Sequence, residues 1–193
     1  TCSNVAFVVV GLRYVGRVRE LGLATMALGI GSALFHATNT RTAEYMDEGA
    51  MTWVVLAILR QLVHPCRWMT CLWIALLSSS LYVWSHNYLY FAVPWSLGCM
   101  LVAWLCLYQV RLVWKSYLTM LGATLMWVVE QTQCEHHPTL FVCHALWHVG
   151  SACVLDQVLL YISTHIRHVS YYRDALVRSA AEKKTRPADD VDP

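Results

Sequence analysis

Two histidines, His144 and His148, lie four positions apart in one of the most apolar stretches of the chain. A third, His36, ends another apolar stretch, and Asp47 follows it eleven positions later. Ionisable side chains at the ends of candidate membrane spans are costly to place, so they need a compensating interaction. Three neutral histidines with a fourth position left open describe a catalytic zinc site. We therefore predict that His36, His144 and His148 share one metal ion.

The spacing within the second stretch supports this hypothesis but does not prove it. Positions i and i+4 lie on one helix face about 5–6 Å apart, which suits two ligands of one metal. A structural or interfacial pair is the commoner explanation of such histidines in a membrane protein. Zinc proteases of the HExxH type carry their general base inside the motif. Here Ala, Leu and Trp fill positions 145–147, so any base must come from elsewhere, and Asp47 is the natural candidate.

Three further residues could support a metal site. Ser32 lies four positions before His36, where its hydroxyl could donate a hydrogen bond to a developing oxyanion. It is equally a small residue of the kind that lets membrane helices pack closely. Glu130, with Trp127 one turn before it, could hold a ligating histidine in orientation. A plain interfacial position explains both residues as well.

Two other carboxylates receive a structural interpretation. Glu48, beside Asp47, is expected to be a solvated charge at the membrane boundary. Asp156 lies eight positions after His148, which is about 80° away around a helix, too far for a fellow ligand. We expect Asp156 to line a polar cavity or to pair with another helix.

The composition indicates a membrane protein. Hydrophobic residues make up 58% of the 193 residues and charged residues 13%, with a mean hydropathy of +0.45, whereas soluble domains are nearer a quarter charged. The eight cysteines are scattered without a CxxC pair, so most are expected to be small buried hydrophobes. We expect no nucleic-acid partner. Because Thr1 begins almost directly in an apolar run, we expect that the N-terminal end of the membrane domain is missing.

Seven apolar stretches approach the length of about 20 residues that a membrane span needs. They cover roughly 3–15, 21–38, 47–64, 67–84, 88–109, 114–131 and 142–163. All-round hydrophobicity favours helices over a barrel, whose strands would alternate. We predict an all-α integral membrane protein, a seven-transmembrane helix bundle of residues 1–163 with an intramembrane zinc site. Residues 164–193 are predicted to form a polar, basic, cytosolic tail.

The basic residues predict an orientation. Thirteen of the fourteen Lys and Arg residues fall in the 13–20, 60–67 and 111–115 loops or in the tail, and only Arg41 falls on the other side. The positive-inside rule then makes the C-terminus cytosolic and the N-terminus lumenal or extracellular. This orientation puts the three histidines and Asp47 in one leaflet, although the count used none of them. A shared site is therefore geometrically possible.

Several segments resemble the alkaline ceramidases, which are seven-span members of the CREST superfamily of membrane hydrolases. The segments are Gly-Ile-Gly-Ser-Ala-Leu-Phe-His-Ala-Thr at 29–38, Tyr-Met-Asp-Glu-Gly-Ala-Met at 45–51 and His-Ala-Leu-Trp-His at 144–148. Thr1-x-Ser3-Asn4 and the region from Trp127-x-x-Glu130 to Cys134 are also similar to the family.

The resemblance implies a function and roles for residues. His36, His144 and His148 would bind Zn²⁺, and Ser32 and Asp47 would be the catalytic partners. The implied reaction is hydrolysis of the amide of ceramide, taken from the bilayer, to a sphingoid base and a free fatty acid. An endomembrane location, in the endoplasmic reticulum or the Golgi, is expected.

Two family features depend on a segment upstream of the Thr1-x-Ser3-Asn4 region. One is an acidic calcium-binding stretch, so Ca²⁺ regulation does not follow from the residues of this chain. The other is a cysteine that pairs, in the family, with the residue matching Cys134. Cys134 is therefore either free or paired with Cys2 or Cys143, which are predicted to share its oxidising side.

Other readings of the same residues remain. An esterase that remodels the lipids of GPI anchors would use the same histidine and aspartate pattern, although Asp47-Glu48-x-x-Met51 and the Gly-x-Gly-Ser run favour the amidase. A zinc-containing receptor of the adiponectin-receptor type is a second alternative. A transporter or scaffold with interfacial histidines is a third, and it would hold no zinc.

Overall fold

The structure is a computed structural model that describes residues 2–63, 65–109, 113–133 and 137–185, with the backbone alone at 106–109, 113, 131, 138 and 165–185. Seven α-helices and two short 3-10 helices, η1 and η2, form this part of the chain. In order they are η1 (Cys2–Asn4), α1 (Val5–Tyr14), α2 (Arg19–Thr38), α3 (Arg41–Leu62), α4 (Pro65–Ser85), α5 (Leu89–Gln109), α6 (Val113–Gln133), η2 (Pro138–Leu140) and α7 (Phe141–Thr185). The predicted all-helical fold is confirmed.

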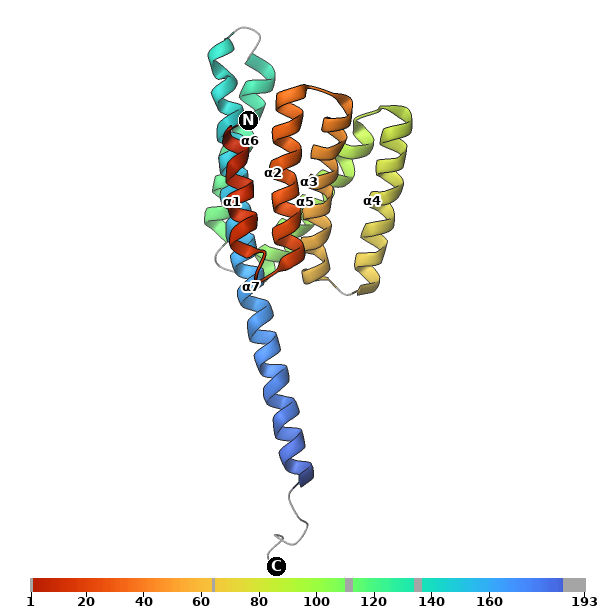
Figure 1. The fold of residues 1–193 in the computed structure, drawn as a ribbon, viewed down its shortest axis with the longest axis vertical. Helices are drawn as coiled ribbons and strands as arrows, with labels where there is room; N and C mark the ends of the chain where they lie inside the picture. Colours follow the sequence, from red (N-terminus) through yellow and green to blue (C-terminus); the bar gives the residue numbers. More distant parts are fainter. Residues whose placement is uncertain (1, 64, 110–112, 134–136, 186–193) are drawn as a thin grey trace, which may run out of the picture.

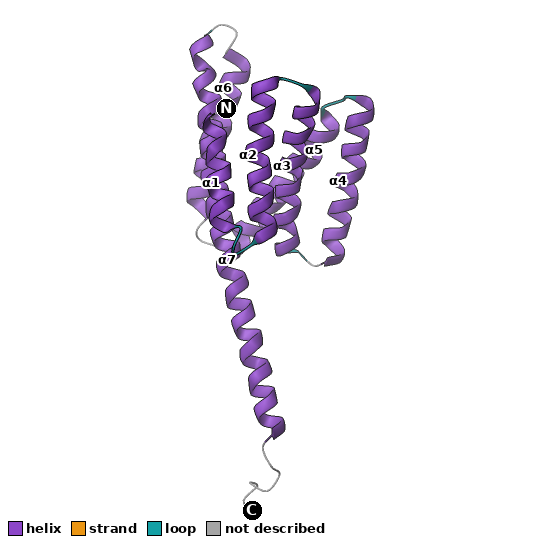
Figure 2. Ribbon diagram, in the orientation of Figure 1, coloured by secondary structure: helices purple, strands orange, loops and turns teal. Residues whose placement is uncertain are grey.

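The helices lie side by side in a bundle (Figures 1 and 2). α1 packs against both α2 and α7, α2 packs along α3, and α6 packs along α7, while α3, α4 and α5 contact one another. α7 continues past the other helices as a single long helix (Figure 1). It therefore crosses position 164 without a break, and the division into a 1–163 domain and a 164–193 tail stays a prediction.

Within the described part of the chain, three helices are long and apolar enough to cross a membrane: α2, α4 and the 141–164 part of α7. The apolar stretches within α1 and α5 are shorter. Large apolar side chains on α4 point outward, among them Trp84, which is 82% exposed. Soluble monomers rarely expose contiguous apolar surface of this kind. A helical membrane protein fits these observations, and the number of spans stays a prediction.

The turn between α2 and α3 is shorter than the sequence analysis predicted. Asn39 ends α2 in the left-handed conformation (φ 47°), with its N–H donating to the Phe35 carbonyl at 2.7 Å. Thr40 then caps α3 by accepting a hydrogen bond from the Ala43 N–H at 3.4 Å. The helix therefore begins six residues before the apolar stretch predicted to span roughly 47–64, and the limits of the span stay a prediction. The cap starts the helix at Arg41, before the apolar stretch begins, so Asp47 lies in its second turn.

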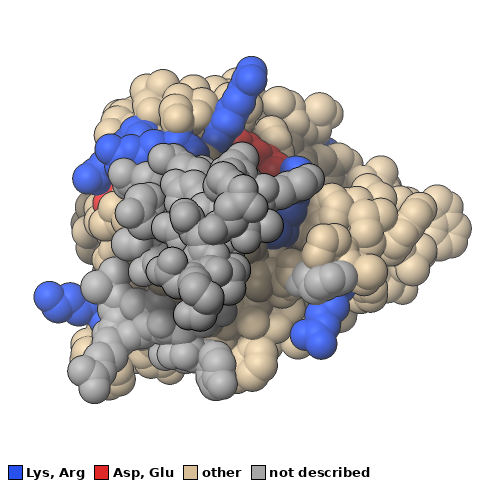
Figure 3. Space-filling model, turned by 90° about the horizontal axis from the view of Figure 1, so that it is seen from below, with Lys and Arg blue, Asp and Glu red and all other residues tan. Residues whose placement is uncertain are grey.

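Ion pairs join the helices at the end of the bundle from which α7 emerges. Arg13 of α1 lies 3.0 Å from Asp156 of α7, and Arg60 of α3 lies 2.5 Å from Glu20 of α2. The hydroxyl of Tyr14 also donates to the Asp156 carbonyl at 3.1 Å. Lys and Arg side chains are spread around this end of the molecule (Figure 3). The expectation that Asp156 pairs with another helix is confirmed.

Gly31 sets how closely α2 approaches α3 near the predicted site. A Cβ atom at this position would lie 3.1 Å from the Met46 carbonyl oxygen and 3.2 Å from the Asp47 Cα. Those distances are tighter than ordinary van der Waals contact, and the neighbours are backbone atoms that cannot rotate away. The missing side chain therefore lets the second turn of α3 lie directly against α2.

We predict that Gly31→Ala is less stable than Gly49→Ala by about 1–3 kcal/mol, because the added methyl group overpacks the α2–α3 contact. Gly49 is the matched control: it lies in α3, and a Cβ there would have no neighbour within 4 Å. Both changes gain the same helix propensity, so the difference reports the contact. Thermal unfolding of the two purified variants in detergent measures it, and equal midpoints would contradict the prediction.

Candidate metal centre

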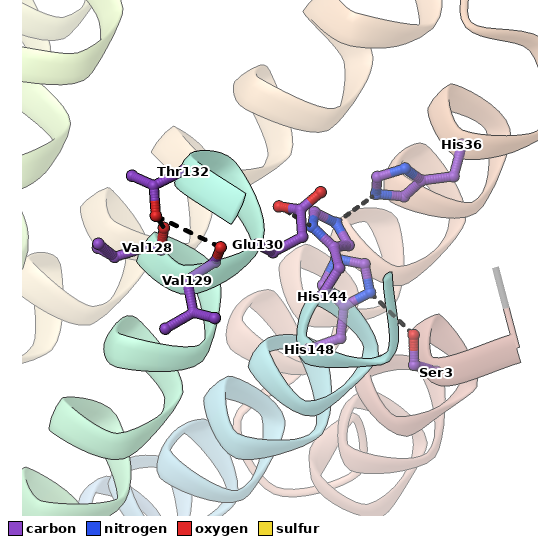
Figure 4. Close-up of polar contacts among 8 residues, drawn as sticks. All are labelled: Ser3, His36, Val128, Val129, Glu130, Thr132, His144 and His148. Carbon is purple, nitrogen blue, oxygen red and sulfur yellow. Dashed lines mark hydrogen bonds and ion pairs between the residues drawn. The ribbon is translucent and has the colours of Figure 1, made fainter. Parts of the chain in front are cut away.

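The three predicted ligands meet at one end of the bundle. His36 lies in the last turn of α2, and His144 and His148 lie in the first turns of α7 (Figure 4). The Nε2 atoms of His36 and His144 are 3.0 Å apart. Each ring offers one nitrogen atom to the cluster, and these three atoms all lie within 4.8 Å of one another. The sequence analysis predicted that these residues share a site, and the structure brings them together.

The three rings differ in their exposure. His148 is buried, with 5% of its surface exposed, whereas His144 is half-buried and His36 is exposed. The ring of Phe7 on α1 packs edge-on against His148, with ring centroids 6.0 Å apart. The cluster is thus closed on the side of α1 and open on the side of His36, where a molecule can approach it.

Each of the two α7 histidines has a side-chain partner at its Nδ1 atom. The Ser3 Oγ lies 3.0 Å from His148 Nδ1, and the Glu130 Oε2 lies 3.4 Å from His144 Nδ1 (Figure 4). Partners of this kind fix the ring orientation and the tautomer, and they leave Nε2 available for a ligand. Glu130 thus lies beside a predicted ligand, and its role in orienting that histidine stays a prediction. Ser3 was not among the predicted site residues, although it lies in the Thr1-x-Ser3-Asn4 segment.

Trp127 takes a less direct position. Its ring lies against the ring of Trp147, with centroids 6.1 Å apart, and Trp147 directly precedes His148 in α7. This contact joins α6 to α7 beside the ligands. Trp127 therefore acts, at most, through the packing of α7.

The cluster fits a divalent metal ion of the zinc type. Zn–N bonds of about 2.0–2.1 Å in tetrahedral geometry put two bound nitrogens roughly 3.3 Å apart. The His36–His144 separation of 3.0 Å is close to this value, and imidazole is a ligand that zinc favours. Two neutral Nε2 atoms facing each other also need either a shared proton or a cation between them. The chemistry of this donor set therefore agrees with a metal.

Ser32 and Asp47 form a pair beside the histidines. Ser32 is 3% exposed, and its side chain lies near the Asp47 carboxylate. Ser32 precedes His36 by one helical turn, so both lie on one face of α2. Among the described residues, the Asp47 Oδ1 is buried without a hydrogen-bond partner. The structure thus places a buried carboxylate oxygen with unused acceptor capacity against α2, the helix that carries His36.

Glu48 is buried, with 9% of its surface exposed, so its expected role as a solvated boundary charge was wrong. Its carboxylate lies near Tyr82 of α4, whose hydroxyl donates to Glu44 at 3.3 Å. The Glu48 Oε2 is buried without a hydrogen-bond partner among the described residues. The reason is that α3 starts at Arg41, so α4 packs over Glu48 and excludes solvent from it.

Among the six cysteines whose exposure the structure describes, only Cys143 is buried, so the expectation that most cysteines are buried was wrong. Cys2 and Cys143 are free thiols. Cys134 lies outside the described residues, so its pairing stays a prediction.

These observations define a helical protein with a metal-type histidine cluster and an adjacent serine–carboxylate pair at one end of its bundle. No known family model matches the chain. The chain is 26% identical over 177 residues to the alkaline ceramidase of Arabidopsis thaliana, with 77% of this chain and 69% of the plant protein covered. The chain is therefore related to the alkaline ceramidases, as its motifs predicted.

We predict that Ser3→Ala weakens zinc binding by about 10- to 100-fold, because His148 loses the partner that orients its ring. Ser3→Thr keeps the hydroxyl and should restore most of the affinity. Ser151→Ala is the control, since its hydroxyl is on α7 but has no hydrogen-bond partner among the described residues. Zinc titration with a competing chelator measures all three, and unchanged affinity in Ser3→Ala would exclude this role.

Proposed function

We propose that this chain is a zinc-dependent intramembrane amidase that hydrolyses ceramide to a sphingoid base and a free fatty acid. The observation that carries the proposal is the convergence of His36, His144 and His148 beside the Ser32–Asp47 pair. Similarity to an alkaline ceramidase supports a hydrolase of this type. Hydrolysis of a lipid amide agrees both with the geometry of the site and with this similarity.

The three histidines would hold the zinc ion. When bound, zinc acts as a Lewis acid toward a carbonyl oxygen and lowers the pKa of a coordinated water toward about 7. Asp47 accepts the proton of the attacking water through its unpartnered Oδ1 and later delivers a proton to the leaving amine. Proton transfer through one carboxylate then serves both the formation and the breakdown of the tetrahedral intermediate.

Ser32 has a single hydroxyl proton, and this limits what it can do at each step. While Asp47 is ionised, the hydroxyl can donate to the nearby carboxylate and hold it in place. Once Asp47 has taken the proton of the water, the carboxyl group no longer needs that donor. Ser32 is then free to donate to the developing oxyanion.

The membrane setting of the proposal follows from the distribution of charge and apolar surface. We propose that residues 1–163 form a seven-span bundle in an endomembrane, with the N-terminus lumenal and the 164–193 tail cytosolic. The basic side chains at the end from which α7 emerges support this orientation. A two-chain lipid then reaches the exposed side of His36 from within the bilayer.

We predict that Asp47→Asn lowers ceramide turnover by about 10²- to 10⁴-fold, because the amide cannot accept the proton of the water. Bound zinc should remain at the wild-type level, since Asp47 is not a ligand. Asp156→Asn is the matched control: it removes the same charge far from the site, where the carboxylate binds Arg13. Fatty acid release from labelled ceramide and zinc content by mass spectrometry are measured on the same preparations.

The same assay separates the alternatives. Zinc-loaded protein that releases no fatty acid from ceramide but cleaves an ester-linked lipid would be the GPI-lipid type of esterase. Turnover near background for both lipids would favour a receptor of the adiponectin-receptor type. Protein without zinc, whose metal content and activity do not change in His148→Ala, would remove the metal-site proposal itself.

We predict that a tag fused after Pro193 is digested when protease is added to sealed microsomes, because the tail faces the cytosol. A tag placed before Thr1 should be protected until detergent is added. The reverse pattern would contradict the proposed orientation, although it would leave the chemistry of the site unchanged.

A further inference from the structure

A shallow groove of about 410 Å³ lies between α1 and α2. Its lining is apolar apart from Asn4, and it includes Val5 and Val8 on α1 and Gly29, Ala33 and Ala37 on α2. α2 is one of the helices that is long and apolar enough to cross a membrane. The groove therefore offers a hydrocarbon chain an apolar channel along the outside of the bundle.

Asn4 is an unusual residue in this groove. Only 1% of its surface is exposed, and neither its Nδ2 nor its Oδ1 has a hydrogen-bond partner among the described residues. It directly precedes α1, where Asn commonly caps a helix, yet its side chain makes no capping hydrogen bond. Leaving a buried amide without a hydrogen bond destabilises the folded state. Such a group in a folded protein calls for an explanation, and a ligand is one.

The groove borders the metal centre. Asn4 follows Ser3, whose hydroxyl contacts His148 at 3.0 Å (Figure 4). On α2, Ala33 is three positions before His36, so the two are neighbours on the helix surface, and Ala37 follows His36 directly. A molecule whose chain lies in the groove thus has its polar end beside the histidine cluster.

We propose that this groove binds one hydrocarbon chain of the substrate lipid and that the Asn4 side chain recognises the amide linkage of that lipid. The proposal rests on the proposed function and adds a binding site to it. A secondary amide carries one N–H donor and one C=O acceptor, and the Asn side chain offers the complementary acceptor and donors. The bilayer core holds no water to replace such a partner.

This complementarity distinguishes an amide from an ester. An ester has a carbonyl oxygen but no N–H, so the Asn4 Oδ1 stays unpaired when an ester-linked lipid occupies the groove. Sites that hydrogen-bond a substrate N–H discriminate strongly against analogues that lack it. Asn4 is therefore a specificity residue for amide-linked lipids.

The test measures binding separately from turnover. Full-length protein in lipid nanodiscs is titrated with a fluorescent ceramide and with an analogue in which an ester replaces the amide. The Asp47→Asn background prevents hydrolysis during the titration. The wild-type groove should bind the ceramide at least 10-fold more tightly than the ester analogue.

Asn4→Leu should remove this preference, weakening ceramide binding about 10-fold while leaving the ester analogue nearly unchanged. Its thermal midpoint should stay equal or rise, because the variant no longer buries an unsatisfied amide.

Val8→Ala is the control, which trims the groove without changing polarity and should affect both lipids alike. Ile30→Trp fills the groove from α2, where Ile30 is half exposed, and should weaken both.

The outcomes test lipid binding in the groove separately from the proposed amidase activity. If Asn4→Leu unfolds at a clearly lower temperature, or if it binds ceramide as the wild type does, Asn4 is structural and the inference is overturned. Unchanged binding in Ile30→Trp would equally exclude the groove. If the wild type binds ceramide with the expected preference but releases no fatty acid, the groove stands and the proposed amidase activity fails.

Discussion

The contact between the ring nitrogens of His36 and His144 organises this end of the molecule. The two residues are 108 positions apart, and they meet because the last turn of α2 and the first turn of α7 end at the same level of the bundle. α1 packs against both helices and so fixes the distance between them. Two facing imidazole nitrogens need either a shared proton or a cation between them. Ser3 and Glu130 contact the Nδ1 atoms of the two α7 histidines.

The sequence allowed the helices and the grouping of the three histidines to be predicted, because apolar length and basic flanks are local properties. It did not predict where α3 begins, since the apolar pattern does not register the cap at Thr40. It also missed the burial of Glu48, which depends on Tyr82 of the next helix. Ser3 was overlooked because its partner, His148, is 145 positions away. Contacts at such separations follow from the packing of the helices and not from spacing.

Asp47 and Glu48 show how one helix separates two similar side chains. Consecutive residues point about 100° apart around an α-helix. Asp47 therefore faces α2, where the missing side chain of Gly31 allows close approach, and Glu48 faces α4. Each carboxylate keeps a buried oxygen without a hydrogen-bond partner among the described residues, Asp47 on the α2 side of α3 and Glu48 on the α4 side.

The two-residue turn at Asn39 and Thr40 brings together Ser32 and Asp47, which are close in the sequence but lie on different helices. Ser32 and Asp47 are fifteen positions apart within one helical hairpin, so their pairing closes only a short loop. The His36–His144 contact closes a loop of 108 positions, which costs roughly 2 kcal/mol more in chain entropy. Contacts of this range also form late in folding. A metal bound by these histidines would tether the early-forming hairpin to the last helix, so that loading the ion also completes the closure of the bundle.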